Sequence, residues 1–358
     1  MKEITTVGVD LAKFVFTVHG VDAAGRTVLR KTLRREKLME LIAALPPCLI
    51  GMEACGGAHE WARKFQACGH RVGIMMARFV VPYRKSSKND GNDAEAICEA
   101  VARPNMRFVP VKSAEQQAVL SLHRVRQGFI EQRTATINRI RGLLAEFGIV
   151  LPQRADQVRR AAVVVAQELP VLAREAIADL REHLAYLDER IRSYEQQLIS
   201  LAKQHEPARR IQQLTGVGPL TASAITASIA TGHEFTNGRQ FAAWLGLVPR
   251  QYSTGGKTRL GRITKRGDGY LRTLLMLGAR AVLQSAGQRA DRLSAGRWRC
   301  ERVAAITEPS SRLPPRMRAS SGPCWRGIEH SRCLSNGRDY QRRFNLEAST
   351  TASAMRKR

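Results

Sequence analysis

The sequence lacks several features that would place it in a membrane or in an oxidising compartment. No apolar run approaches the roughly 18 residues that a membrane-spanning helix needs. The first residues, MKEITTVGVD, lack the basic and apolar regions of a secretory signal peptide. None of the seven cysteines belongs to a CxxC pair, the spacing typical of structural zinc and redox motifs. We therefore expect a protein of a reducing cytoplasm, with no structural zinc and no membrane partner.

Acidic residues are scarce beside basic ones. The 358 residues include 58 Lys and Arg but only 31 Asp and Glu, which gives a formal net charge of +27. A surface field of this size attracts polyanions, so nucleic acid is the leading partner. A ribosome-type structural protein and a protein that binds an anionic membrane surface are the alternatives. Glycine (28) and proline (14) are also few, and 44% of the residues are hydrophobic, which excludes collagen-like and wholly disordered chains.

The residue pattern changes three times along the chain and predicts four segments. In residues 1–110, short β-branched runs alternate with amphipathic stretches, which predicts an α/β domain. Residues 111–206 contain no strand-like run for most of their length and predict a helical arm. Residues 207–290 are glycine-rich and basic, and we expect a mostly helical domain. Residues 291–358 show no sustained period and predict an irregular basic tail, either a nucleic-acid-binding segment or the out-of-frame end of a gene.

Apolar residues in the helical arm recur at alternating steps of four and three. They are Leu180, Leu184, Leu187, Ile191, Tyr194, Leu198 and Leu201. This heptad seam predicts a coiled-coil arm. The pattern does not name the partner helix, which can belong to the same chain or to a second copy.

Four acidic residues stand out in the α/β segment. Asp10 ends the first predicted strand, in VGVDLAK, and Glu53 ends another, in IGMEACG. Asp90 and Asp93 lie three residues apart at the start of a predicted helix, so both can point to one side of it. Ligand sites of α/β sheets collect at strand ends. Carboxylate oxygens are the ligands that Mg²⁺ or Mn²⁺ prefers, and two such ions can act on a phosphodiester.

Each acid also has an ordinary interpretation. Asp90 can cap its helix, Glu53 can form a surface hydrogen bond, and Asp10 can be a turn residue. For any one acid taken alone, that interpretation is favoured. Together, acids placed after buried strands in a strongly basic chain predict a bound divalent cation.

These motifs resemble a known family. VGVDLAK, MEACGGAHEWAR and KSSKNDGNDAEAICEA look like the RuvC-like DEDD domain of insertion-sequence transposases of family 110, specifically the 1111 group. LTGVGPLTASAI and FAAWLGLVPRQYSTGGKTRLGRITKRGDGYLRTLLMLGARA resemble the C-terminal transposase domain of that family. The resemblance covers about residues 4–288 and departs after Asp291, where family members continue in helical sequence. It implies a RuvC/RNase H-like fold for the first domain and divalent metal held by Asp10, Glu53, Asp90 and Asp93.

The C-terminal domain opens with a glycine motif. In LTGVGPL, Gly216 and Gly218 separate two helical stretches, a helix-hairpin-helix-like arrangement in which backbone N–H groups can approach a phosphate. An ordinary tight turn between helices is equally compatible with a single GxG motif.

A basic loop follows in QYSTGGKTRLGRITKRG. Ser253 and Thr254 precede two glycines, whose backbone freedom can expose a hydroxyl group. The cations that follow predict phosphate binding, and they are Lys257, Arg259, Arg262, Lys265 and Arg266. The residues alone favour a serine in a DNA-contacting loop. The resemblance implies that Ser253 is the nucleophile that becomes linked to DNA, with Thr254 as the rival.

The leading hypothesis is therefore a transposase and site-specific recombinase. The resemblance further implies an RNA from the element itself that guides the choice of DNA, and a protein of the bacterial nucleoid. We expect the arm to mediate a dimer or tetramer that brings the acids of one copy to the serine loop of another. A RuvC-like nuclease that uses water, and a non-enzymatic nucleic-acid-binding scaffold, are the alternatives.

Overall fold

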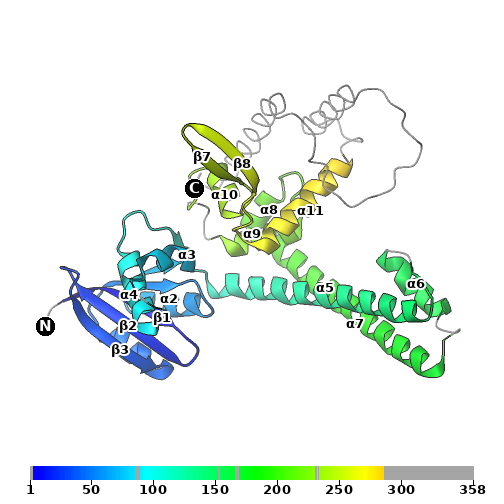
Figure 1. Cartoon of the computed structure of the whole chain (residues 1–358), viewed down its shortest axis with the longest axis horizontal. Coiled ribbons are helices and arrows are strands. Elements are labelled where there is room, and N and C mark those ends of the chain that lie inside the picture. Colours follow the sequence, from blue (N-terminus) through cyan, green and yellow to red (C-terminus); the bar gives the residue numbers. More distant parts are fainter. Residues whose placement is uncertain are drawn as a thin grey trace. The chain divides into compact units, whose positions relative to one another are not determined.

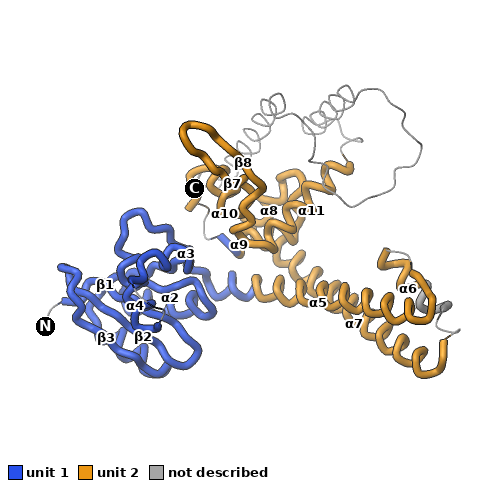
Figure 2. Tube along the Cα trace, in the orientation of Figure 1, with its two compact units in different colours: residues 1–118, 228–230 blue, residues 119–227, 231–358 orange. Residues whose placement is uncertain are grey.

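The computed structural model describes residues 3–85, 87, 89–151, 154–165, 169–229, 232 and 234–285. The chain divides into two compact units, shown in Figure 2. Unit 1 comprises residues 1–118 and 228–230, and unit 2 comprises residues 119–227 and 231–358. The tail predicted for residues 291–358 lies outside the described residues. No helix in the described part of the chain is long and apolar enough to cross a membrane.

Unit 1 is built on a six-stranded mixed sheet, so the predicted α/β class is confirmed. Its strands are β1 (Ile4–Leu11), β2 (Val15–Asp22), β3 (Thr27–Arg34), β4 (Leu49–Glu53), β5 (Arg71–Met75) and β6 (Phe108–Val109). They lie in the order β3-β2-β1-β4-β5-β6. Strands β1, β4 and β5 are parallel, whereas β2, β3 and β6 pair antiparallel to their neighbours. This order agrees with an RNase H-like domain.

Helices cover both faces of the sheet. Alternating apolar residues of the strands, such as Val7, Val9 and Phe16, form a core with α1 (Leu38–Ala43) and α2 (Ala58–Ala67) on one face. The long helix α4 (Asp90–Val101) packs on the other face, against β1, β2 and β4. The short elements η1 (Arg35–Lys37), α3 (Ala77–Val80) and η2 (Val81–Tyr83) complete the unit. Because the middle of β1 and of β4 is covered on both faces, the runs Val7–Val9 and Leu49–Met52 contain no polar side chain.

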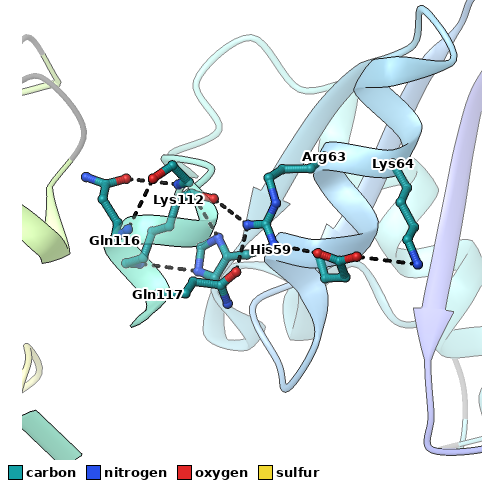
Figure 3. Close-up of polar contacts among 8 residues, drawn as sticks. His59, Arg63, Lys64, Lys112, Gln116 and Gln117 are labelled. Carbon is teal, nitrogen blue, oxygen red and sulfur yellow. Dashed lines mark hydrogen bonds and ion pairs between the residues drawn. The ribbon is translucent and has the colours of Figure 1, made fainter. Parts of the chain in front are cut away.

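Polar contacts fasten the start of α5 (Ala114–Glu146) to α2, as Figure 3 shows. Arg63 donates to the carbonyl oxygen of Lys112 at 2.6 Å and to Oε1 of Gln117 at 2.7 Å. The backbone N–H of Lys112 donates to Nδ1 of His59 at 3.3 Å. Ser113 caps the helix, because its Oγ accepts from the N–H of Gln116.

Unit 2 is mostly helical. Beyond α5 it contains α6 (Ala155–Val165), α7 (Val171–Gln204), α8 (Glu206–Ile211), α9 (Pro219–Ser228), α10 (Gly238–Trp244) and α11 (Gly269–Ser285). A two-stranded hairpin of β7 (Pro249–Thr254) and β8 (Lys257–Ile263) stands between α10 and α11, and Figure 1 shows it in yellow.

The heptad seam of α7 packs within the chain. Helices α5 and α7 run antiparallel, because Arg126 pairs with Glu195 at 3.0 Å and Arg133, one heptad later, pairs with Asp188, one heptad earlier. Leu184 is buried in a cluster with residues of α5 and α6. Of the two partners that the pattern left open, the structure provides the one in the same chain.

Candidate functional site

Three glycines form a row across the central strands of unit 1. Gly8 of β1 lies opposite Gly51 of β4, and Gly51 lies opposite Gly73 of β5. A Cβ atom on Gly8 would lie 2.2 Å from the carbonyl oxygen of Ala94, and one on Gly51 would lie 2.7 Å from the side chain of Val101. The glycines thus allow α4 to pack closely against the sheet.

The direction of α4 follows from the same contacts. Cys98 donates its thiol to the carbonyl oxygen of Thr6 at 3.6 Å, and Ala94 lies over Gly8, two residues further along β1. The helix therefore crosses the strands: Gly91 lies beside Arg30 of β3, Ala94 and Cys98 lie over Gly8 of β1, and Val101 lies over Gly51 of β4 and Gly73 of β5. Its first turn, which carries Asp90 and Asp93, has Gly91 against the guanidinium of Arg30 from β3.

Asp10 and Glu53 lie side by side at those strand ends. They directly follow Val9 and Met52, which pair in the parallel register of β1 and β4. Side chains alternate along a strand, so both acids share the face of Gly8 and Gly51, which is the face that α4 covers. Both are half-buried. Burial, followed by the charges of Asp10 and Glu53, raises the pKa of the nearby Cys55 thiol.

The two acids of α4 differ in their surroundings. Asn89 caps the helix, because its side-chain oxygen accepts from the N–H of Asn92 at 2.8 Å. The interpretation of Asp90 as the helix cap is therefore wrong, and its exposed carboxylate lies in the first turn. Asp93 is partly buried and accepts a charged hydrogen bond from Arg84 at 3.2 Å. No motif in the sequence points to this arginine.

The four acids are a candidate site for a divalent ion. The four carboxylates are hard oxygen ligands; Asp10 and Glu53 lie side by side on β1 and β4, and Asp90 and Asp93 lie in the first turn of α4. Among the described residues, no group of three or more His, Cys, Asp or Glu side chains is close enough to hold an ion as the side chains stand. The Arg84 guanidinium instead neutralises Asp93. The donor types are those that Mg²⁺ or Mn²⁺ prefers.

In unit 2, the serine lies on the β7–β8 hairpin. Gly255 and Gly256 form its two-residue turn, with φ angles of +55° and +77° that suit glycine. Ser253 lies opposite Thr258 and is exposed. The side-chain amide of Gln251 donates to Ser253 Oγ at 2.7 Å.

The register divides the predicted residues between the two faces of the hairpin. Thr254 lies opposite Lys257, and Tyr252 lies opposite Arg259. These four side chains share one face, because cross-strand partners and alternate residues point the same way. Ser253 is on the other face. The structure therefore does not place Lys257 and Arg259 beside the predicted nucleophile.

The remaining cations of the loop follow the same strand. Arg262 is exposed on β8 where the register with β7 shifts, so strand alternation does not assign it to either face. Lys265 and Arg266 are exposed in the segment between β8 and α11. That segment packs against the end of α10, because the N–H of Lys265 donates to the carbonyl oxygen of Gly246 at 3.0 Å.

The glycine motif between α8 and α9 has a packing role at one position. Gly216 has a φ of +87°, and its carbonyl oxygen would lie 2.0 Å from a Cβ atom on Gly278 of α11. The close approach at Gly216 is thus to another helix of the unit. Gly218 faces open space and is the member of the pair that a ligand can reach.

Unit 2 contains a buried histidine that no motif in the sequence indicates. His123 of α5 is 1% exposed, and its ring nitrogens lie 2.9 Å from the hydroxyls of Tyr270 and Ser223. Ser223 donates its own proton to the carbonyl oxygen of Leu220, so Nε2 of His123 donates to Ser223 and Nδ1 accepts from Tyr270. Burial lowers the pKa of His123 to about 4. Its partners come from α9 and α11, which only the tertiary structure reveals.

Comparison with known proteins matches both parts of the chain. Residues 208–294 match the family described as "Transposase IS116/IS110/IS902 family", and residues 7–149 match a DEDD transposase family of the IS110 type. A probable family 20 transposase of Pseudomonas aeruginosa is 49% identical over 300 residues, covering 82% of this chain and 88% of the relative. The transposase for insertion sequence element IS1111A of Coxiella burnetii is 42% identical over 305 residues, covering 82% of each chain. The transposase for insertion sequence element IS1328 of Yersinia enterocolitica is 41% identical over 295 residues, covering 82% of this chain and 88% of the relative.

Proposed function

The chain belongs to the IS110/IS1111 family of insertion-sequence transposases, enzymes that transfer DNA strands, and from this premise we propose that Asp10, Glu53, Asp90, Asp93 and Ser253 carry out its chemistry. The observation that carries the proposal is the placement of the four acids. Asp10 and Glu53 lie side by side on the adjacent parallel strands β1 and β4. The row of glycines lets α4, which carries Asp90 and Asp93 in its first turn, pack closely on the face of the sheet that these two acids share. Membership in the family excludes the non-enzymatic scaffold.

The acids are proposed to hold Mg²⁺ or Mn²⁺. A divalent ion at this edge would supply positive charge to the scissile phosphate and to the leaving oxygen. Asp10 and Glu53 would provide the fixed side of the site, since both lie on strands. Asp93 would give up its ion pair with Arg84 to bind the ion. The exposed side chain of Asp90, in the first turn of α4, would rotate toward the same ion.

Ser253 is proposed as the nucleophile. Its Oγ attacks the phosphorus, an ester bond from serine to phosphate forms, and the bond from phosphorus to the leaving deoxyribose oxygen breaks. The serine proton ends on that leaving oxygen, so one phosphodiester replaces another and the energy of the cut bond is kept for rejoining. Gln251 holds the Oγ by donating to it, which leaves the serine proton free to depart.

Nucleic-acid binding is proposed to rest on the basic surface. Lys257 and Arg259 share one hairpin face, Arg262 is exposed further along β8, and Gly218 is open to a phosphate at the helix-hairpin-helix-like turn. The net charge of +27 supports binding of DNA and of an RNA guide made by the element. Replacing Lys257 and Arg259 should reduce the salt dependence of DNA binding by about 0.9 in slope per lost contact on duplex DNA.

The proposed organisation is a catalytic domain at residues 1–110, a coiled-coil-like arm at 111–206 formed by α5 and α7, and a serine domain at 207–290. A dimer or tetramer is proposed because transposition cuts several strands in concert. In this structure the heptad seam is used within the chain, so contacts between copies are expected to involve other surfaces of the arm.

The test measures strand cleavage and protein-linked DNA with purified protein, DNA of the element ends and its flanking RNA. Asp10→Asn and Asp93→Asn should abolish both, because neutral amides coordinate Mg²⁺ poorly. Glu40→Gln, which changes an exposed acid of α1, is the control and should retain both. Undiminished cleavage in Asp10→Asn or Asp93→Asn would sink the assignment of the acids. Cleavage that persists in Ser253→Ala without linked DNA would favour the alternative, a RuvC-like nuclease that uses water.

A further inference from the structure

The edge strand β3 carries an acid-free run of cations. Between Asp22 and Glu36 the chain has five basic residues and no acidic one, and they are Arg26, Arg30, Lys31, Arg34 and Arg35. In the described sheet, β3 pairs with β2 on one side and ends the sheet on the other. An exposed cationic edge discourages pairing with another strand, which is one reason for such a sequence.

Two of these cations already have structural partners. Arg26 pairs with Asp22 at 3.1 Å. The guanidinium of Arg35 lies over the rings of Phe16 and Trp61. The other three are exposed, and none of them has a carboxylate within ion-pair distance among the described residues. Lys85 first, and the charge of Arg30 with it, lowers the pKa of Glu95, so Arg30 already faces one acid without an ion pair, whereas Lys31 and Arg34 are available to a ligand.

The register of the sheet places two of the three on the face of the acids. Thr32 lies opposite Thr17, and Thr17 lies opposite Asp10. Adjacent strands are about 4.8 Å apart, so Thr32 lies about 10 Å from Asp10 across the sheet. Arg30 and Arg34 flank Thr32 at two residues on either side and share its face, whereas Lys31 points to the opposite face.

Arg30 also reaches the helix that carries the other acids. A Cβ atom on Gly91 would lie 2.6 Å from Nη2 of Arg30, so the guanidinium rests against the backbone of the residue that follows Asp90. Arg30 therefore spans from β3 to the first turn of α4. The hydroxyls of Thr17 and Thr32, which lie in the cross-strand row of Asp10, are 3.3 Å apart.

We propose that Arg30, Thr32 and Arg34 form a phosphate-binding ledge for the DNA strand that enters the acidic site. A cluster of four carboxylates repels the phosphates of its own substrate, and cations one or two nucleotides away offset that repulsion. On this face β2 is buried under α4, so the exposed surface next to the acids that a strand cut at Asp10 and Glu53 can follow is the edge strand β3, with Arg30, Thr32 and Arg34. The choice of DNA over RNA rests on the proposed function, because the strand being cut passes the acids.

The test compares neighbours on one strand. Arg30→Gln and Arg34→Gln remove a charge from the ledge, and Lys31→Gln removes the same charge from the other face of β3. Binding of a fluorescent single-stranded DNA is measured in EDTA across a salt series, so that cleavage plays no part. Each ledge variant should reduce the slope of log K against log salt by about 0.7, the value for one phosphate contact on a single strand. Lys31→Gln should leave the slope unchanged.

Two further variants control for damage to the edge strand and for failure of the proposed metal site. Arg30→Lys with Arg34→Lys retains both charges and should retain the wild-type slope, which separates phosphate binding from damage to the edge strand. An equal loss of slope in Lys31→Gln would overturn the proposal, since it would show only a general effect of charge. A loss seen with single-stranded RNA but not with DNA would also overturn it. Asp10→Asn provides the separate test: normal cleavage in that variant would refute the proposed metal site without changing the outcome at the ledge.

Discussion

Gly8 of β1 lies directly opposite Gly51 of β4, and α4 crosses both. Because neither residue has a side chain, the helix approaches until the carbonyl oxygen of Ala94 is 2.2 Å from where the Cβ of residue 8 would be. This close packing determines where the first turn of α4 lies. The positions of Asp90 and Asp93 thus depend on two residues that carry no functional group.

The first prediction is that Gly8→Ala destabilises unit 1 and disturbs its acidic edge. The added methyl would meet helix backbone, which cannot rotate away, so a loss of about 1–3 kcal/mol in the free energy of unfolding is expected. Gly128→Ala is the control, because Gly128 lies in α5 with open space around it and should gain about 0.5–1 kcal/mol. Urea unfolding measures both. Equal stability of the wild type and Gly8→Ala would contradict the close approach of α4.

The second prediction concerns the ion pair of Arg84 with Asp93. Arg84→Gln should strengthen Mg²⁺ binding, because it removes a cation that competes for the Asp93 carboxylate. Lys85→Gln is the matched control, since its exposed ammonium pairs with Glu95 instead, at 2.9 Å. Isothermal titration with Mg²⁺ gives the affinity without requiring activity. Weaker binding in Arg84→Gln would show that the arginine supports the site.

The third prediction tests whether the heptad seam packs within one chain or joins two copies. Leu187 is fully buried, so Leu187→Ala should cost about 2–5 kcal/mol of stability. Its neighbour Tyr186 is 54% exposed, and Tyr186→Ala should cost far less. If the seam acts within the chain, as the pairing of Arg126 with Glu195 indicates, light scattering should give both variants the wild-type mass. A fall to monomer mass with unchanged stability would show that the seam joins two copies.

The fourth prediction is a stability that depends on pH through His123. Burial lowers the pKa of this ring from 6.5 to about 4, so between these values the unfolded chain binds a proton that the folded chain does not. Stability is therefore complete above pH 6.5 and falls as the pH drops toward 4, by on the order of 3 kcal/mol. Urea unfolding at pH 7 and pH 5 measures the fall. His123→Gln should be less stable at pH 7 and should show a smaller loss on acidification; the same loss as wild type would assign it to other groups.

Much of unit 1 could be predicted from local pattern, because its strands are short apolar runs and its acids follow them directly. Asp10 and Glu53 were found for that reason. Arg84 and Arg30 could not be predicted in this way, because their positions near the acids depend on the strand register and on how closely α4 packs on the sheet. The heptad seam from Leu180 to Leu201 predicted the helix but not its partner, because such a seam packs equally well against a helix of the same chain and a helix of a second copy.

The hairpin shows the same limit at the residue level. The sequence STGGK indicates a tight turn flanked by a hydroxyl and a cation, and the structure has that turn. Whether Ser253 or Thr254 shares a face with Lys257 depends on the register, which a shift of one residue would reverse. Sequence alone cannot decide this, because both hydroxyls are equally close to the turn glycines.

The fifth prediction is that Ser253, not Thr254, becomes linked to DNA. Ser253 is a primary hydroxyl held by the amide of Gln251, whereas Thr254 is β-branched and lies opposite Lys257. Ser253→Ala should abolish protein-linked DNA on a denaturing gel. Thr254→Val keeps the shape of the residue and should retain the link, and Gln251→Ala should slow its formation while leaving the linked residue the same. Mass spectrometry of the linked peptide identifies that residue directly. A phosphonucleotide on Thr254, with linkage retained in Ser253→Ala, would instead place the chemistry on the face that carries Lys257 and Arg259, where the cations would serve the nucleophile itself.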